Sequence, residues 1–125
     1  LFKWALFDRF PMPTWGKGRV SLLGDACHPM LPFMAQGSAM AIEDAAVLAN
    51  CLTHASDVPT GLQRYEALRK PRTAQVQNTS RRNARVFHMR GIGAFLRNQA
   101  AARAGQNAME KIYAYDALHL GIEET

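Results

Sequence analysis

The sequence has few cysteines and no long hydrophobic stretch. Among its 125 residues only Cys27 and Cys51 are cysteines, too few for a disulfide framework, so we expect a reducing compartment and, by elimination, the cytoplasm. No apolar run approaches the roughly 20 residues of a membrane span, and no signal peptide opens the chain. These absences exclude a disulfide-rich secreted domain and predict that a membrane is not a partner.

Strand patterns are also scarce. The alternation of Phe2, Trp4 and Leu6 with less apolar residues predicts a half-buried strand at the start of the chain. The apolar run Arg19–Leu23 predicts a short buried strand of an open sheet. Strands need neighbours to pair with, and few others are predicted. We therefore expect a piece of a longer protein, whose missing N-terminal part is its first partner.

The composition is that of an ordinary folded protein, with 48% hydrophobic and 20% charged residues. The net charge is +5, and ten basic residues crowd the stretch 64–103. We interpret them as a solvated helix face with salt bridges to absent parts; the alternative is a helical binding module for an anionic partner. No nucleic-acid-binding motif accompanies the charge, so nucleic acid is not expected as a partner. The ten are Arg64, Arg69, Lys70, Arg72, Arg81, Arg82, Arg85, Arg90, Arg97 and Arg103.

Helical spacing dominates the rest of the chain. A first helix is predicted from about residues 36–38 to Leu52, with a stripe of mostly small apolar residues that would face a neighbouring sheet. Off that stripe lie Glu43 and Asp44, interpreted as charges near the helix start that pair with an arginine of the missing domain. The stripe is Ile42, Ala45, Ala46, Ala49 and Leu52.

A second helix is predicted from about Thr60, and Pro71 is expected to interrupt or restart it. Gly91 and Gly93 then break the pattern, and two shorter helices are expected over about 92–103 and 106–117. The predicted fold class is therefore a mostly α fragment with one or two short strands. Tyr113 and Tyr115 are interpreted as aromatic side chains that dock the end of the chain.

The segment from Leu22 to Ala46 combines features of a ligand site. A buried strand that ends at Gly24–Asp25 would place a carboxylate at the carboxyl edge of a sheet, where ligands of open α/β sheets bind. Asp25 could accept hydrogen bonds from hydroxyl groups of a sugar or sugar alcohol. The helix that opens at Gln36–Ser38 would present unpaired N–H groups and its dipole to an electronegative group.

The stretch Gly18–Leu52, GRVSLLGDACHPMLPFMAQGSAMAIEDAAVLANCL, resembles the second flavin-binding motif of the class A flavoprotein monooxygenases, the group that includes salicylate, 3-hydroxybenzoate and 6-hydroxynicotinate hydroxylases. The similarity covers most of the chain. It continues through Tyr65–Glu66, Arg69–Arg72, Val76–Gln77, Ser80–Arg81 and, more faintly, Arg97–Asn98.

The resemblance implies a set of cofactor-binding residues. Asp25 would bind the ribityl chain of FAD, with Gly24 and Ala26 shaping the turn around it. Pro32 would lie beside the isoalloxazine ring on the substrate side. Backbone N–H groups would face the N1 and C2 carbonyl edge of the flavin, where a helix N-terminus favours negative charge; they belong to Gln36, Gly37, Ser38 and Ala39.

The resemblance also implies the fold and the reaction. The chain would be the C-terminal part of an α/β, Rossmann-like FAD-binding monooxygenase fold: residues 1–17 would end the substrate-domain sheet, 18–90 complete the FAD-binding domain and 91–125 form C-terminal helices. Such enzymes hydroxylate a phenolic or heteroaromatic acid with FAD, NADH or NADPH, and oxygen. An epoxidase, a halogenase or another non-hydroxylating member of the flavin fold is an alternative, and a homo-oligomer is left open.

The family pattern is incomplete here. Pro32, Phe33 and Met34 are candidates for the substrate pocket, but several relatives have a polar residue where this chain has Pro32–Phe33, and Phe33 cannot donate a hydrogen bond. The family's N-terminal Gly-rich fingerprint and mid-chain Asp-Gly motif are absent, so the fragment alone is expected to be inactive and to bind FAD weakly or not at all. The catalytic base, the nicotinamide preference and most of the substrate pocket are expected outside these residues.

Cys27 and His28 invite a metal or nucleophile interpretation. No further ligands fall at zinc-like spacing, and no activating base for Cys27 is identified. We therefore predict no metal, and expect His28 to hydrogen-bond within its loop.

Overall fold

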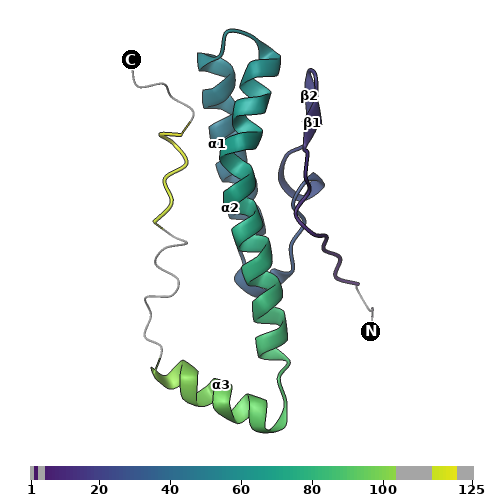
Figure 1. Cartoon of the computed structure of the whole chain (residues 1–125), viewed down its shortest axis with the longest axis vertical. Coiled ribbons are helices and arrows are strands. Elements are labelled where there is room, and N and C mark those ends of the chain that lie inside the picture. The colour runs from purple at the N-terminus through teal and green to yellow at the C-terminus, as the bar shows by residue number, and fades with distance from the viewer. Residues whose placement is uncertain (1, 3–4, 104–113, 121–125) are drawn as a thin grey trace.

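The structure, a computed structural model, describes residues 2, 5–103 and 114–120. Three helices dominate it (Figure 1), so the predicted mostly helical fold is confirmed. No helix within these ranges combines the length and apolar character needed to cross a membrane. The helices are α1 Gly37–His54, α2 Val58–Phe87 and α3 Gly91–Arg103; the smaller elements are β1 Gly16–Lys17, β2 Val20–Ser21 and the 3₁₀ turns η1 Gly24–Ala26 and η2 Pro32–Met34.

The strands are shorter than predicted. The run Arg19–Leu23 forms a strand only at β2, which pairs antiparallel with β1 and leaves Val20 69% exposed, so a buried strand is wrong for this chain by itself. The predicted opening strand is absent from its described positions, residue 2 and residues 5–7, while residues 1, 3 and 4 lie outside the described part. Both results have one cause, since a strand needs a partner for its backbone groups.

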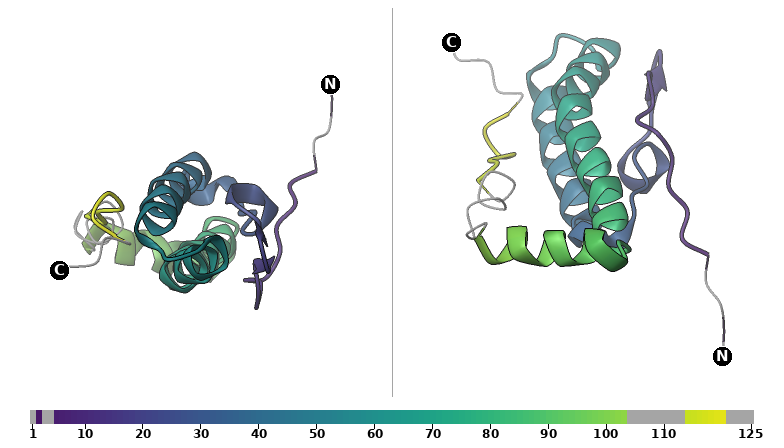
Figure 2. Two further views of the ribbon diagram at one scale, coloured as in Figure 1. Left: turned by 90° about the horizontal axis from the view of Figure 1, so that it is seen from above. Right: turned by 60° about the horizontal axis from the view of Figure 1, so that its bottom comes forward.

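Helices α1 and α2 run antiparallel and pack along most of α1 (Figure 2). The face that α1 buries contains Met40, Asp44, Val47 and Cys51. The predicted stripe faces elsewhere, with Ile42 71% exposed and the other stripe residues exposed or half-buried. The stripe therefore does not make the contact with α2, and its approach to a neighbouring sheet stays a prediction.

Helix α2 is continuous over 30 residues. Its N-cap is Asp57, whose carboxylate accepts the N–H of Thr60 at 2.8 Å. Pro71 lies inside the helix without breaking it, which corrects the expected interruption. Its ring is exposed, and the residues on either side, Arg69 and Arg72, are held by buried contacts to α1, so the loss of one backbone donor is tolerated.

An aromatic cluster closes the core between the helices and the N-terminal segment. Trp15 is buried, with its ring centroid 5.6 Å from that of Tyr65 and 5.4 Å from that of His28. The backbone N–H of Trp15 donates to Glu66 Oε2 at 3.1 Å, which ties the segment to α2. Helix α3 crosses the end of α2 (Figure 2), as expected for 92–103. Of the predicted helix 106–117, residues 114–117 are not helical and the rest lie outside the described part.

Candidate functional site

The turn at Gly24–Asp25 follows the hairpin and opens η1. Gly24 has φ +61°, a conformation that glycine adopts without steric cost, and a Cβ there would lie 3.3 Å from Cβ of Ala41. The Gly24 carbonyl accepts the N–H groups of Cys27 and His28, both at 3.0 Å. The turn is thus tight, and it packs directly against α1.

The turn and the N-terminus of α1 form a groove of about 490 Å³. Asp25 is exposed, and its Oδ1 lies 4.0 Å from the point where a Cβ on Gly37 would be. Gln36 provides no side-chain cap, and the Met40 N–H to Gln36 carbonyl bond is the first of the helix, so the N–H groups just before Met40 have no intrahelical acceptor. The groove is lined by Leu23, Gly24, Asp25, Gly37, Ser38, Ala41 and Ile42.

The groove brings together four of the residues predicted for the cofactor: Gly24, Asp25, Gly37 and Ser38. The other four do not line it. Ala26 and Pro32 are exposed, Gln36 is buried and Ala39 is half-buried. The Ala26 carbonyl accepts a hydrogen bond from Nη2 of Arg9 at 2.8 Å, so the N-terminal segment holds the far side of η1.

Two of the residues predicted for a substrate pocket pack against α2. The ring of Phe33 lies 6.0 Å from that of Phe87 and 5.7 Å from that of His88. Met34 is buried, and its sulfur accepts the side-chain N–H of Asn83 at 2.8 Å. Neither side chain lines the groove at Asp25, whereas Pro32 leaves its ring exposed next to them.

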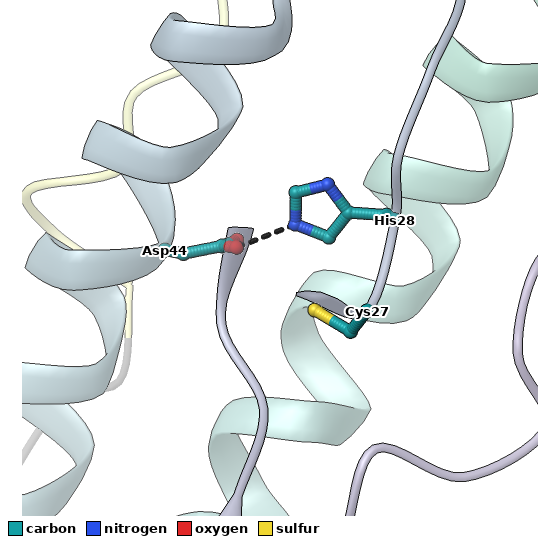
Figure 3. A group of neighbouring side chains, drawn as sticks. All are labelled: Cys27, His28 and Asp44. Carbon is teal, nitrogen blue, oxygen red and sulfur yellow. Dashed lines mark hydrogen bonds and ion pairs between the residues drawn. The ribbon is translucent and has the colours of Figure 1, made fainter. Parts of the chain in front are cut away.

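Asp44 connects the turn to both helices, a role that sequence reasoning missed. Its Oδ2 accepts the backbone N–H of Gly24 at 3.0 Å and lies 2.5 Å from Nε2 of His28 (Figure 3). Its Oδ1 accepts Nε–H of Arg69 at 2.7 Å. A carboxylate has only acceptors, so Nε2 of His28 carries the proton of that contact. The His28 ring therefore contacts α1, and the hydrogen bond within its own loop comes from its backbone N–H, which donates to the Gly24 carbonyl.

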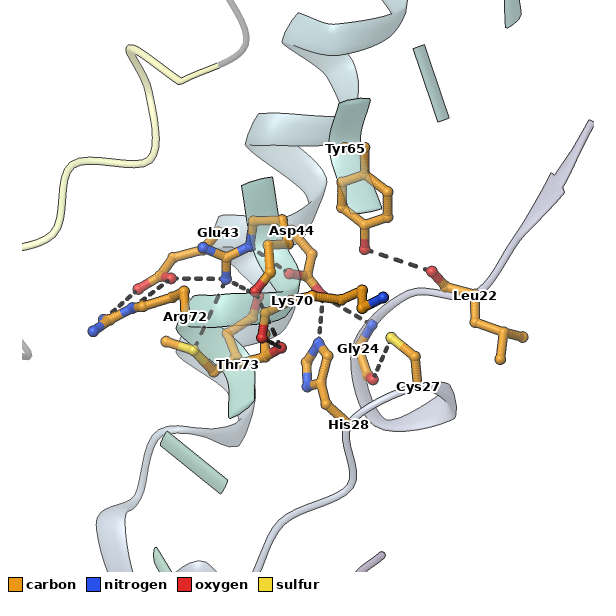
Figure 4. A network of polar contacts seen from close by, with 12 residues as sticks. Leu22, Gly24, Cys27, His28, Glu43, Asp44, Tyr65, Lys70, Arg72 and Thr73 are labelled. Atoms are coloured by element: carbon orange, nitrogen blue, oxygen red, sulfur yellow. Dashed lines mark hydrogen bonds and ion pairs between the residues drawn. The ribbon is translucent and has the colours of Figure 1, made fainter. Parts of the chain in front are cut away.

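Two acidic residues of α1, Glu43 and Asp44, pair with two arginines of α2, Arg69 and Arg72. Figure 4 shows this network. Glu43 contacts Nη2 of Arg69 at 2.8 Å and Nη2 of Arg72 at 3.1 Å. The predicted pairing with arginine is thus present, but both arginines belong to this chain. Tyr115 packs against the two guanidinium groups, with its ring centroid 4.4 Å from Cζ of Arg72; Tyr113 lies outside the described residues.

Burial would raise the pKa of Asp44, but hydrogen bonds from His28 and Arg69 outweigh it and hold this pKa below 3.8. The carboxylate is therefore ionised at neutral pH. For Cys27, burial and the charge of Asp44 raise the pKa of the thiol to about 12. A thiol that stays protonated is a poor nucleophile.

Cys27, His28 and Asp44 are close enough to suggest a metal site. Their donor atoms, however, have other partners. Both oxygens of Asp44 accept hydrogen bonds, one of them from a cationic guanidinium, and Sγ of Cys27 contacts the Gly24 carbonyl at 3.3 Å. A cation would have to break the contact between His28 and Oδ2 of Asp44 and deprotonate Cys27. The cluster fits a hydrogen-bonded charge network better than a metal site.

The arginine-rich half of the chain is largely engaged within the molecule. Arg69 and Arg72 pair with α1, Arg81 pairs with Asp8, and Arg97 donates to the carbonyls of Val86 and Phe87 at the end of α2. These contacts weaken the alternative of a binding face for an anion, while salt bridges to absent parts of the polypeptide stay a prediction.

A family model described as "FAD binding domain" matches residues 5–80. Two curated relatives are similar over much of the chain. The first, "3-hydroxybenzoate 6-hydroxylase 1" of Aquipseudomonas alcaligenes, is 48% identical over 78% of this chain and 25% of its own length. The second, "6-hydroxynicotinate 3-monooxygenase" of Pseudomonas fluorescens, is 53% identical over 65% of this chain and 22% of its own length. The chain thus spans about a quarter of the length of these relatives.

Solved structures share the arrangement of these elements. A "Salicylate hydroxylase substrate complex" is 36% identical with a TM-score of 0.71, covering 91% of this chain and 29% of its own. Klebsiella pneumoniae HpxO, complexed with FAD and uric acid, is 28% identical with a TM-score of 0.73, covering 84% of this chain and 28% of its own. The predicted fold class, a C-terminal fragment of an FAD-binding monooxygenase fold, is therefore confirmed.

Proposed function

Because the chain belongs to the FAD binding domain family, we propose that it forms one wall of the flavin site of a monooxygenase that hydroxylates a phenolic or heteroaromatic acid. The reaction would use FAD, NADH or NADPH, and oxygen. The observation that carries the proposal is the groove at Asp25, where an exposed carboxylate adjoins the uncapped N-terminus of α1. The chain spans only part of its relatives, so the rest of the site lies elsewhere in the polypeptide.

The donors and acceptors of the groove suit the two ends of the flavin moiety. Among the described residues, none donates a hydrogen bond to the Asp25 carboxylate, so both oxygens are available to the hydroxyl groups of a ribityl chain. The N–H groups of Gly37, Ser38 and Ala39 point toward the start of α1, where its dipole favours negative charge. We assign them to the N1 and C2 carbonyl edge of the ring.

The small residues of the groove leave space for the flavin to approach the backbone closely. Gly37 has no side chain between Asp25 and the helix, and Gly24 keeps the turn low against Ala41. We assign Ala26 to the shape of the turn and the exposed Pro32 to the substrate side of the ring. Gln36 would contribute through its backbone, since its side chain is buried.

FAD, when bound, supplies the oxygen-transfer chemistry, and the residues of this chain bind and orient it. Asp25 would fix the position of the ribityl chain, and the helix N-terminus would stabilise negative charge on the ring edge. The catalytic base and most of the substrate pocket would come from other parts of the polypeptide. With Phe33 and Met34 packed on α2, we propose that Pro32 is the pocket contact from this loop.

Substrate-stimulated oxidation of NADH or NADPH tests the activity. The full-length protein is mixed with each nicotinamide and a panel of salicylate, 3-hydroxybenzoate and 6-hydroxynicotinate, and the decrease in absorbance at the nicotinamide band is followed. We expect one of these acids or a close analogue to accelerate oxidation and to appear as a hydroxylated product. A full-length protein that purifies colourless and takes up no FAD would contradict the proposal.

Product analysis separates hydroxylation from other reactions of the flavin fold. A product that contains one added phenolic oxygen supports the proposal, whereas an epoxide, a halogenated ring or oxidation of nicotinamide without product points to a non-hydroxylating member. Both cysteines, Cys27 and Cys51, are free and buried, and we propose the cytoplasm as the site of the reaction.

A further inference from the structure

The Asp44 carboxylate joins three separate segments of the chain. Oδ2 holds the Gly24 N–H of the turn and His28 of the following loop, while Oδ1 holds Arg69 of α2 (Figure 4). Asp44 and Arg69 both have fully buried side chains. Asp44 lies seven residues after Gly37, two turns further along α1 and on the same side of the helix. One carboxylate therefore sets the turn relative to the helix that forms the other side of the groove.

We infer that Asp44 is a positioning residue of the proposed cofactor site, which holds the Gly24–Asp25 turn in place over the N-terminus of α1. The inference rests on the proposed function. The position of the Asp25 carboxylate would then depend on the hydrogen bond from the Gly24 N–H to Asp44. His28 and Arg69 would support Asp44 in the same network.

Asp25 depends on the backbone of its turn because its own side chain has no anchor among the described residues. Its side chain is exposed and receives no hydrogen bond from the described residues. Its direction is therefore set by the backbone of Gly24, which has a positive φ and many alternative conformations. The N–H of Gly24 is fixed by Asp44 at 3.0 Å, and its carbonyl by the turn. Release of the N–H would free the orientation of Asp25.

Substitution of Asp44 by asparagine would remove one of the two acceptor oxygens of this side chain. An asparagine has one acceptor and one NH₂ group, so the NH₂ group would face either Arg69 Nε–H on one side or Gly24 N–H and His28 Nε2 on the other. The cationic guanidinium binds the remaining oxygen more strongly than a neutral amide does. In Asp44→Asn the oxygen would therefore stay with Arg69, and the turn would lose its anchor.

Glu43 offers a matched control on the same helix. It pairs with Arg69 and Arg72, and no described contact links it to the turn. Glu43→Gln removes one negative charge by the same isosteric change. Val47 is fully buried in α1 and apolar, so Val47→Ala supplies a variant that loses stability without altering polar contacts to the loop.

The experiment titrates the full-length apoprotein with FAD and follows flavin fluorescence, with Tm measured for each variant. We expect the Kd of Asp44→Asn to rise about tenfold or more, and those of Glu43→Gln and Val47→Ala to stay within about threefold of wild type. At saturating FAD, the visible circular dichroism of the flavin should change in Asp44→Asn and not in Val47→Ala, since a general loss of stability does not reorient the ring.

The outcomes separate this inference from the proposed function. If wild type binds FAD and Asp44→Asn binds it equally well, or if the three variants lose affinity in proportion to Tm, the positioning role is overturned and the flavin site stands. If wild type binds no FAD, both fail. Where Asp44→Asn does not fold, Asp44→Asn combined with Arg69→Gln removes both buried charges; the same loss of affinity supports the role, and wild-type affinity overturns it.

Discussion

Buried charge in this chain is concentrated on two carboxylates of α1 and two guanidinium groups of α2. Asp44 and Arg69 are fully buried, and Glu43 and Arg72 extend the pairing toward the surface. Such a pair is costly to desolvate, and the loss of one member leaves the other uncompensated. The arrangement therefore makes the relation between α1, α2 and the turn sensitive to single substitutions.

Arg69→Met should be among the most destabilising substitutions in the chain. The methionine fills part of the space but leaves Asp44 ionised and buried, and breaking a buried pair costs about 3–5 kcal/mol. Arg82→Met, at an exposed position of α2, should change the free energy of unfolding by less than about 0.5 kcal/mol. Denaturant unfolding of the two variants measures the difference. Equal effects would show that the Asp44–Arg69 pair is not what holds the helices together.

The same carboxylate should make stability depend on pH in the acid range. Its pKa in the folded state lies below the ordinary value of 3.8, so the unfolded state binds a proton first as pH falls. The stabilisation is fully present above pH 3.8 and is lost as pH falls through the folded pKa. The stability difference between wild type and Asp44→Asn should therefore be constant above about pH 5 and shrink below 3.8. A difference that shrinks with rising pH would contradict this sign.

The residue pattern predicted part of this site and missed the rest for a physical reason. Gly24, Asp25, Gly37 and Ser38 are close in sequence, and local geometry is enough to place them around one groove. The contacts of Asp44 join positions 16 to 25 residues apart. The packing of α1 against the turn and against α2 creates them. The pair Arg69 and Arg72, spaced to lie on one side of a helix, was the available signal.

At the scale of elements, the close approach of α1 and α2 defines the molecule. Helix bounds followed from capping and spacing: α1 and α3 begin and end near the predicted residues, and Asp57 caps α2. One expectation failed at this scale, and one buried face was not foreseen. Pro71 does not break α2, and α1 buries a face that contains a charged residue. In both places tertiary contacts override what the local pattern favours.

Gly61 of α2 packs closely against the end of α1 and should not accept a side chain. A Cβ there would lie 3.0 Å from the Cys51 carbonyl oxygen and 3.2 Å from Cβ of Ala55. Gly61→Ala should destabilise by about 1–3 kcal/mol through overpacking, despite the better helix propensity of alanine. Gly93 in α3 is the control, because a Cβ there meets atoms no nearer than 3.9 Å; Gly93→Ala should stabilise by about 0.5 kcal/mol. Thermal unfolding compares them, and a stabilised Gly61→Ala would disprove the close packing.

At the scale of the whole molecule, apolar surface remains on the outer faces. Ile42 of α1 is 71% exposed, and Ile92 and Phe95 of α3 are similarly open. The chain spans about a quarter of the length of its relatives. The family could be recognised from the motif at Gly24–Ala46, but the buried face of α1 could not, because it depends on contacts between residues far apart in the sequence. The division at residues 17 and 90 stays a prediction.

The central claim is that the Gly24–Asp25 turn and the start of α1 bind the flavin. Its most direct test is FAD titration of the full-length apoprotein with Asp25→Ala, beside Asp57→Asn, a control at an exposed N-cap where asparagine caps equally well. We predict that wild type and Asp57→Asn bind FAD alike and that Asp25→Ala binds it at least about tenfold more weakly, with Tm of the apoprotein unchanged. Wild-type affinity in Asp25→Ala would contradict the account.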